Sequence, residues 1–117
     1  MNRLKVIAVD RHGIEFEGGV RMYSSHVQDC CEHHELTFTD LRLSDFDSLE
    51  FDLSNDDFFK RIEGYGIELI PIQGYSIRIP GHGYNNGYYG TNILLCIDGP
   101  NINKQYDVSE CQVIDEW

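Results

Sequence analysis

Basic residues are scarce in this chain. Its 117 residues include 9 lysines and arginines against 20 aspartates and glutamates, which gives a net charge of −11. A chain this acidic repels nucleic acid phosphates and anionic membrane surfaces. We therefore expect no direct contact with nucleic acid or membrane. A protein partner, and a basic one in particular, fits this charge better.

Long apolar runs are also missing. The longest, residues 93–97, is too short to cross a bilayer. Near the start only four apolar residues, 6–9, precede Asp10, which is too few for a signal-peptide core. No Asn-x-Ser/Thr acceptor occurs. These absences predict a cytoplasmic protein with reduced thiols.

Familiar catalytic motifs are absent as well. The chain has no phosphate-binding loop, no Gly-x-Ser-x-Gly, no His-Glu-x-x-His and no Gln-x-Cys-Trp. Of its four cysteines, Cys30 and Cys31 are neighbours, and a bond between them would strain the intervening peptide. We expect free thiols.

The pattern of apolar residues predicts a mostly β (α+β) fold in a single globular domain, 1–117. Apolar and acidic residues alternate in residues 14–17 and again in 49–53, as they do in half-buried strands. We expect an antiparallel curled sheet or partial barrel of about seven or eight short strands.

One short helix is expected after Ser54 or Asn55, either of which can cap it. Phe58, Phe59 and Ile62 follow at helical spacing, and Gly64 lies just beyond. Residues 75–98 are expected to form one long hairpin, because Asn86-Gly87 favours a tight turn.

The tip of that hairpin is rich in glycine and tyrosine. Tyrosine offers a large contact area at low entropic cost. The candidate binding residues are Tyr84, Asn86, Tyr88 and Tyr89. Alternatively, these tyrosines pack back on the sheet.

Residues 26–34 hold three of the five histidines and two of the four cysteines. The cluster of interest consists of His26, Gln28, Asp29, Cys30, Cys31 and Glu32. Candidate ligands for zinc are His26, Cys30, Cys31, His33 and His34. Structural zinc sites usually take two ligand pairs from separated segments, so this spacing is unfavourable. In the alternative interpretation the cysteines are small buried side chains and the histidines are solvated.

His26 and Cys30 are also close enough in sequence for a thiolate and imidazole pair. Known pairs of this kind take their members from distant parts of the chain. We therefore keep a thiol-dependent enzyme as an alternative only.

A second notable segment, residues 40–57, carries seven acidic residues and one basic residue, Arg42. Leu49, Phe51 and Leu53 alternate with acids there. This is typical of a half-buried strand with a solvated acidic face, and it is also compatible with an interaction surface.

Two blocks resemble a family of small bacterial and phage-borne proteins of unknown function. The first is His26-x-Gln28-Asp29-Cys30-Cys31-Glu32, and the second is Gly74-Tyr75-x-x-x-Arg78 leading into Asn86-Gly87-Tyr88-Tyr89. The resemblance covers roughly residues 20–98 and brings no established activity. It implies that the two blocks act as a set. The family more often has small or apolar residues where this chain has His33 and His34.

These observations predict a small intracellular accessory protein of phage or mobile-element type. It would act by macromolecular binding, through its acidic face or its tyrosine-rich segment. In this interpretation Asp29 and Glu32 bond to backbone donors of the tyrosine segment and form a structural latch. The alternative is a metal-binding or thiol-dependent enzyme centred on His26, Cys30 and Cys31. No cofactor is expected under the first interpretation, and zinc under the second.

Overall fold

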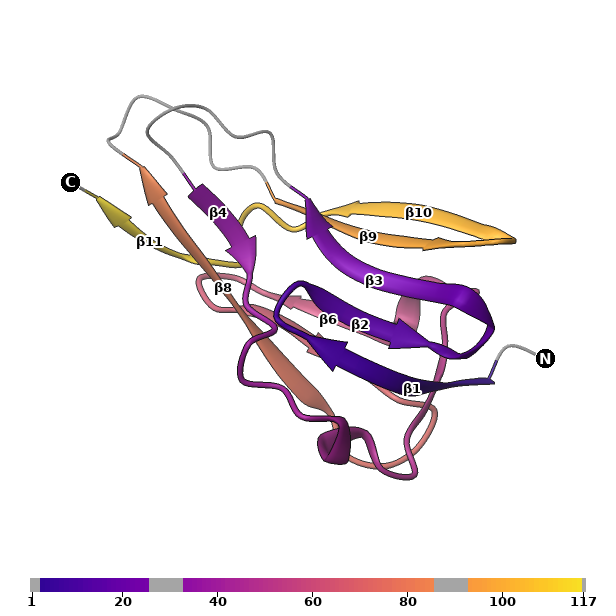
Figure 1. The fold of residues 1–117 in the computed structure, drawn as a ribbon. Coiled ribbons are helices and arrows are strands. Elements are labelled where there is room, and N and C mark those ends of the chain that lie inside the picture. Colours follow the sequence, from indigo (N-terminus) through magenta and orange to yellow (C-terminus); the bar gives the residue numbers. More distant parts are fainter. Residues whose placement is uncertain (1–2, 26–32, 86–92, 117) are drawn as a thin grey trace.

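The computed structural model describes residues 3–25, 33–85 and 93–116. Eleven strands and three short 3-10 turns make up this part of the chain (Figure 1). In chain order they are β1 (Arg3–Asp10), β2 (Gly13–Phe16), η1 (Glu17–Gly19), β3 (Val20–Ser25), β4 (His33–Leu36), η2 (Leu43–Phe46), β5 (Glu50–Asp52), η3 (Asp56–Phe58), β6 (Phe59–Ile62), β7 (Gly66–Leu69), β8 (Ile77–Asn85), β9 (Leu94–Gly99), β10 (Ile102–Asp107) and β11 (Val113–Glu116).

The strands form two sheets. A curled six-stranded sheet has the order β10-β9-β3-β2-β1-β5, and a second sheet has the order β11-β8-β7-β6 with β4 also paired to β8. All pairs are antiparallel except that of β11 with β8. The mostly β prediction and the curled antiparallel sheet are confirmed.

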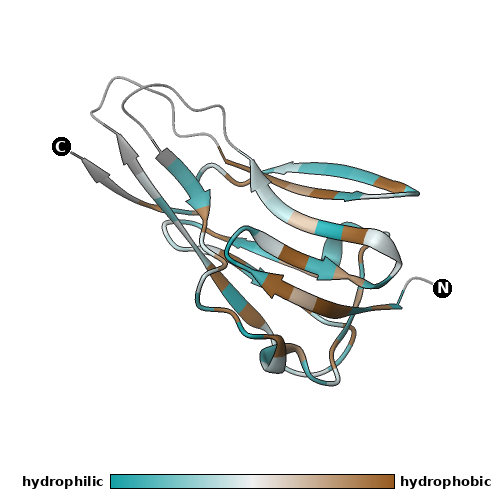
Figure 2. Cartoon of the chain, viewed as in Figure 1, coloured by the Kyte–Doolittle hydropathy of each residue, from teal (hydrophilic) through white to brown (hydrophobic). Residues whose placement is uncertain are grey.

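Alternating side chains explain why these segments are strands. Apolar residues interleave with hydrophilic ones along the first sheet (Figure 2). In β2, for example, Ile14 and Phe16 are fully buried while Glu15 is partly exposed. The buried apolar side chains of both sheets belong to one cluster, so the two sheets share a core.

The expected helix is not found, and the described residues contain no α-helix. The capping signal is real, because the Asn55 side chain accepts a hydrogen bond from Asp57 N at 2.8 Å. Only the turn η3 follows, since Phe59 is already extended and pairs with Leu69 of β7. Burial of both Phe58 and Phe59 fits this turn and strand.

Two further expectations need correction. The described strands number eleven rather than seven or eight, and β10 and β11 are separate strands on either side of residues 108–112. The long hairpin of residues 75–98 is wrong, because β8 and β9 lie in different sheets. β8 pairs with β4, β7 and β11, and β9 pairs with β3 and β10.

None of the described helical turns has the length and hydropathy of a membrane span.

An aromatic cluster joins the two sheets at β6 and β10. The Tyr106 ring of β10 lies 5.1 Å from Phe59 and 5.7 Å from Phe58, centroid to centroid, and Phe58 lies 4.9 Å from Phe59. The Tyr106 hydroxyl donates to Asp56 Oδ1 at 2.7 Å. Edge-to-face ring contacts of this kind add to the free energy gained from burial. The cluster therefore holds the segment around η3 in place.

Truncation of this cluster should be costly. We expect Phe58→Ala to lower the free energy of unfolding by about 3–5 kcal/mol, because it leaves a cavity between the sheets. Tyr75→Ala is the matched control, since that ring is 56% exposed, and we expect it to cost less than about 1 kcal/mol. Urea unfolding measures both, and equal losses would contradict this account of the core.

Candidate functional site

The most distinctive surface of the described chain is a hollow of about 300 Å³ between η3 and the end of β7. We call it the acidic–apolar groove. Its lining consists of Asp52, Asn55, Asp57, Phe58, Ile70, Pro71 and Ile72.

Backbone hydrogen bonds bring the two sides of the groove together. Ile70 N donates to Phe58 O at 2.7 Å, which continues the pairing of β6 with β7. Ile72 N then donates to Glu50 O at 2.8 Å. Residues 70–72 are thereby fixed between β5 and η3.

The Asp52 carboxylate of the groove accepts two hydrogen bonds from Ser54. Asp52 Oδ1 accepts from Ser54 Oγ at 2.5 Å and from Ser54 N at 3.0 Å. These hydrogen bonds from Ser54 hold the pKa of the Asp52 carboxyl below its ordinary value. The groove therefore keeps its negative charge at neutral pH.

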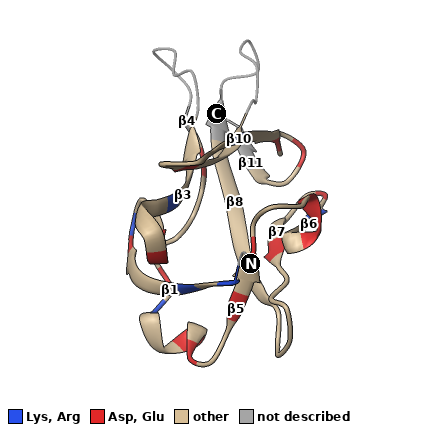
Figure 3. Ribbon diagram, turned by 90° about the vertical axis from the view of Figure 1, so that its right-hand side faces the viewer, with Lys and Arg blue, Asp and Glu red and all other residues tan. Residues whose placement is uncertain are grey.

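The surroundings of the groove add to this charge. Residues 43–58 contain six acidic residues and no basic one, and Figure 3 shows acidic positions, drawn red, at β5 and in the short turn before it. Arg3 lies 3.6 Å from Glu50, and Lys104 lies 3.9 Å from Asp56. Asp57 forms no ion pair with any residue that the structure describes.

One exposed apolar side chain, that of Ile72, lines the groove together with these carboxylates and is 40% exposed. Tyr75, three residues later, is 56% exposed. The Tyr75 hydroxyl donates to Asp45 O at 2.5 Å, which ties its loop to η2. Ile72 therefore gives the groove an apolar contact area beside its charge.

Most residues predicted from the His and Cys cluster lie outside the described part of the chain. These are His26, Gln28, Asp29, Cys30, Cys31 and Glu32, together with Asn86, Tyr88 and Tyr89 of the tyrosine segment. Their described neighbours are paired: His33 is opposite Tyr84, and Ser25 is opposite Leu94. The latch between the two blocks stays a prediction.

His34 is the one proposed metal ligand whose side chain the structure describes. It is 1% exposed, not solvated, and its Nδ1 lies 2.7 Å from Gln112 Oε1. Gly83 makes room for this pair, because a Cβ there would lie 2.1 Å from the His34 ring. Among the described residues no group of three or more His, Cys, Asp and Glu side chains could hold a metal ion. A zinc site therefore stays a prediction about the residues outside them.

The two described cysteines, Cys96 and Cys111, are free and buried. Burial raises the pKa of each thiol above its ordinary value. Cys96 lies opposite Tyr23, whose hydroxyl donates to Asp98. That hydrogen bond, together with burial, raises the pKa of Tyr23 to about 12. These groups stay protonated at neutral pH and are poor nucleophiles.

Sequence reasoning found the acidic side of the groove and missed the apolar side. The apolar side comes from residues 70–72, which follow the end of β7 at Leu69. Pro71, which is unsuited to a strand interior, is the local signal of that end. Comparison with known proteins adds no identification: no family model, no curated protein and no solved structure matches the chain.

The buried thiols give a testable expectation. In the variant Cys30→Ser/Cys31→Ser, we expect Cys96 and Cys111 to react slowly with a chromogenic disulfide at pH 8, because burial and a raised pKa limit the exposed thiolate. Both should react rapidly in urea. Fast reaction of either thiol in the folded variant would contradict the burial described here.

The Tyr23–Asp98 bond predicts a pH dependence of stability. The folded-state pKa, about 12, lies above the ordinary value of 10.0, so the bond stabilises the fold fully below pH 10 and is lost between pH 10 and 12. Urea unfolding of the wild type and Tyr23→Phe should show a stability difference at pH 8 that shrinks at pH 11. If the stability difference between the wild type and Tyr23→Phe stayed constant from pH 8 to pH 11, the Tyr23 hydroxyl would not form the described hydrogen bond with Asp98.

Proposed function

We propose that this protein binds a basic protein partner through the acidic–apolar groove. The observation that carries the proposal is the combination of two carboxylates, Asp52 and Asp57, with the exposed side chain of Ile72 in one hollow. A complementary segment would bring Lys or Arg side chains toward Asp52 and Asp57, and an apolar side chain onto Ile72.

Each kind of contact has a separate physical role. Exposed ion pairs contribute about 0–1 kcal/mol each, so the charges alone cannot supply a stable complex. They raise the association rate and reject acidic partners. Burial of apolar surface, at about 25 cal/mol per Å², supplies the affinity that the ion pairs lack.

The charge of the whole chain supports a protein partner over a nucleic acid. At a net charge of −11, binding to phosphates would have to overcome repulsion over the entire approach. A basic protein surface is drawn toward the same field.

The proposal keeps the class of function expected from the sequence, a small accessory protein that acts by binding. The phage or mobile-element relation is supported only by the resemblance of residues 20–98. The tyrosine segment and the metal- or thiol-dependent alternative rest on residues outside the described part of the chain.

A labelled peptide of alternating Lys and Leu residues is a suitable probe. We expect it to bind with an affinity that falls steeply with salt, while its Glu-for-Lys counterpart does not bind. Asp57→Asn/Ile72→Ser should weaken binding by about tenfold, since it removes one ion pair and one apolar contact. Fluorescence anisotropy measures each affinity.

The matched control is Glu110→Gln/Val113→Ser, which removes one charge and one exposed apolar side chain elsewhere on the surface. Val113 is 48% exposed, close to the 40% of Ile72. We expect this variant to bind within about twofold of the wild type. Equal losses of peptide affinity in the two variants would refute the groove as the contact site. An affinity that does not change with salt concentration would refute it as well.

A further inference from the structure

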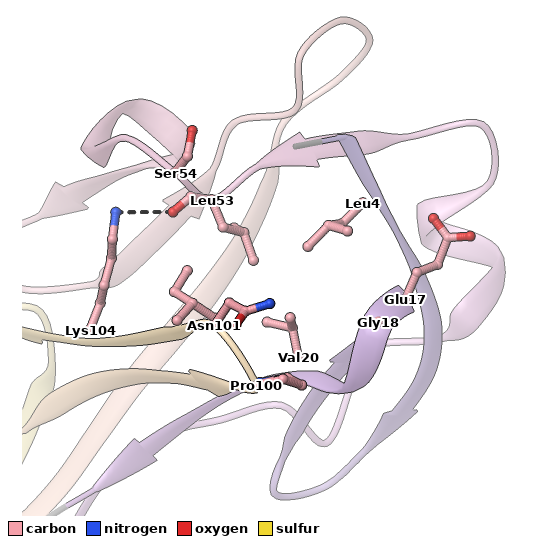
Figure 4. A pocket seen from close by; sticks show the side chains of 10 residues that line it. Leu4, Glu17, Gly18, Val20, Leu53, Ser54, Pro100, Asn101 and Lys104 are labelled. Atoms are coloured by element: carbon pink, nitrogen blue, oxygen red, sulfur yellow. Dashed lines mark hydrogen bonds between the residues drawn. The ribbon is translucent and has the colours of Figure 1, made fainter. Parts of the chain in front are cut away.

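A second and larger hollow, of about 430 Å³, is lined in part by Leu53 and Ser54 of the segment that follows β5 (Figure 4). Four parts of the first sheet and its connections meet there: β1, the turn η1 with the start of β3, residues 53–54, and the tip of the β9–β10 hairpin. Its volume lies in the range of small-molecule sites, which is about 300–1,000 Å³.

The floor of this cavity is apolar. Val20 and Leu53 are buried members of the core, and Leu4 and Ile102 are partly buried against it. Apolar walls with a few polar groups are the usual composition of small-molecule sites.

One end of the cavity carries a positive charge. The Lys104 ammonium donates to Leu53 O at 3.1 Å, which fixes its position with only 28% of the side chain exposed. Its nearest carboxylate partner, Asp56, is 3.9 Å away and 76% exposed. An ammonium has three donors, so two remain for a ligand or that carboxylate.

The other end carries a negative charge. Figure 4 shows Glu17 and Lys104 on opposite sides, with Leu4, Val20 and Leu53 between them. Glu17 Oε1 accepts from Lys5 N at 2.9 Å, and Oε2 makes no hydrogen bond with a described residue. Gly18 and Gly19, both at positive φ, allow the tight turn that places Glu17 there.

We propose that this cavity binds a small linear zwitterion with an apolar middle. Its carboxylate lies at Lys104, its ammonium at Glu17, and its hydrocarbon on the floor between them. A simple anion would be repelled by the net charge of −11 and would leave Glu17 without a ligand partner, and a simple cation would leave Lys104 without one. A zwitterion avoids both costs, and this site does not depend on the proposed function of the groove.

Three probes of equal chain length test the proposal: 8-aminooctanoate, octanoate and octylamine. In a titration followed by ¹H–¹⁵N NMR, we expect 8-aminooctanoate to shift the amides of Leu4, Val20 and Leu53 saturably. Its affinity should be about millimolar, as expected for so few heavy atoms. The two single-charge probes should bind at least fivefold more weakly.

Variants assign each end separately. Lys104→Met should remove the advantage of 8-aminooctanoate over octylamine, and Glu17→Gln should remove its advantage over octanoate. The matched controls are Lys60→Met, which removes one positive charge outside the cavity, and Glu63→Gln, which removes one negative charge there. Both should leave the affinities of all three probes unchanged.

The proposal is overturned if 8-aminooctanoate shifts no cavity amide, or if either single-charge probe binds as tightly to the wild type. Equal changes of affinity in the cavity and control variants would also overturn it, because the affinities would then depend only on the net charge of the protein. The comparison of the three probes uses the wild-type protein, so it does not depend on whether any variant folds. Failure here would leave the Lys and Leu peptide assay of the groove untouched, so the two proposals fail separately.

Discussion

The contact of Tyr106 with Phe58 and Phe59 is the interaction on which both proposed sites depend. It joins β10 of the first sheet to β6 of the second, with ring centroids 5.1–5.7 Å apart. Phe58 also lines the acidic–apolar groove, and its carbonyl oxygen accepts the hydrogen bond from Ile70. On the other side, Asp56 accepts from the Tyr106 hydroxyl and lies near Lys104 of the cavity. Loss of this aromatic cluster would therefore displace residues that line the acidic–apolar groove and residues that line the cavity.

The segment of residues 52–57 forms a wall between the two hollows. Its Asp52, Asn55 and Asp57 line the groove, whereas its Leu53 and Ser54 line the cavity. The chain turns at residues 53–54 and again in η3, which allows these six residues to serve two surfaces. The groove side carries carboxylates, and the cavity side carries a buried leucine and the carbonyl bound by Lys104.

An excess of eleven negative charges has to be accommodated without unfolding the chain. Many of the acids are satisfied locally. Asp52 and Asp107 each accept bonds from a serine two residues later, and both pKa values lie below the ordinary value for this reason. Asp10 of β1 is held by Arg21 of β3, with β2 between these two strands. Such bonds stabilise the ionised forms and leave negative charge on the surface.

The sequence by itself determined the β class, the strands near residues 14–17 and 50–52, and the acidic side of the groove. These follow from side-chain alternation and local turn residues, which act over a few positions. Only the tertiary structure decided the rest. Asn55 caps a single turn because Phe59 pairs with Leu69, and residues 75–98 divide between two sheets because β9 pairs with β3. The apolar side of the groove and the opposed charges of Lys104 and Glu17 likewise join residues far apart in the chain. Such contacts depend on long-range strand pairing, which leaves no local pattern in the sequence.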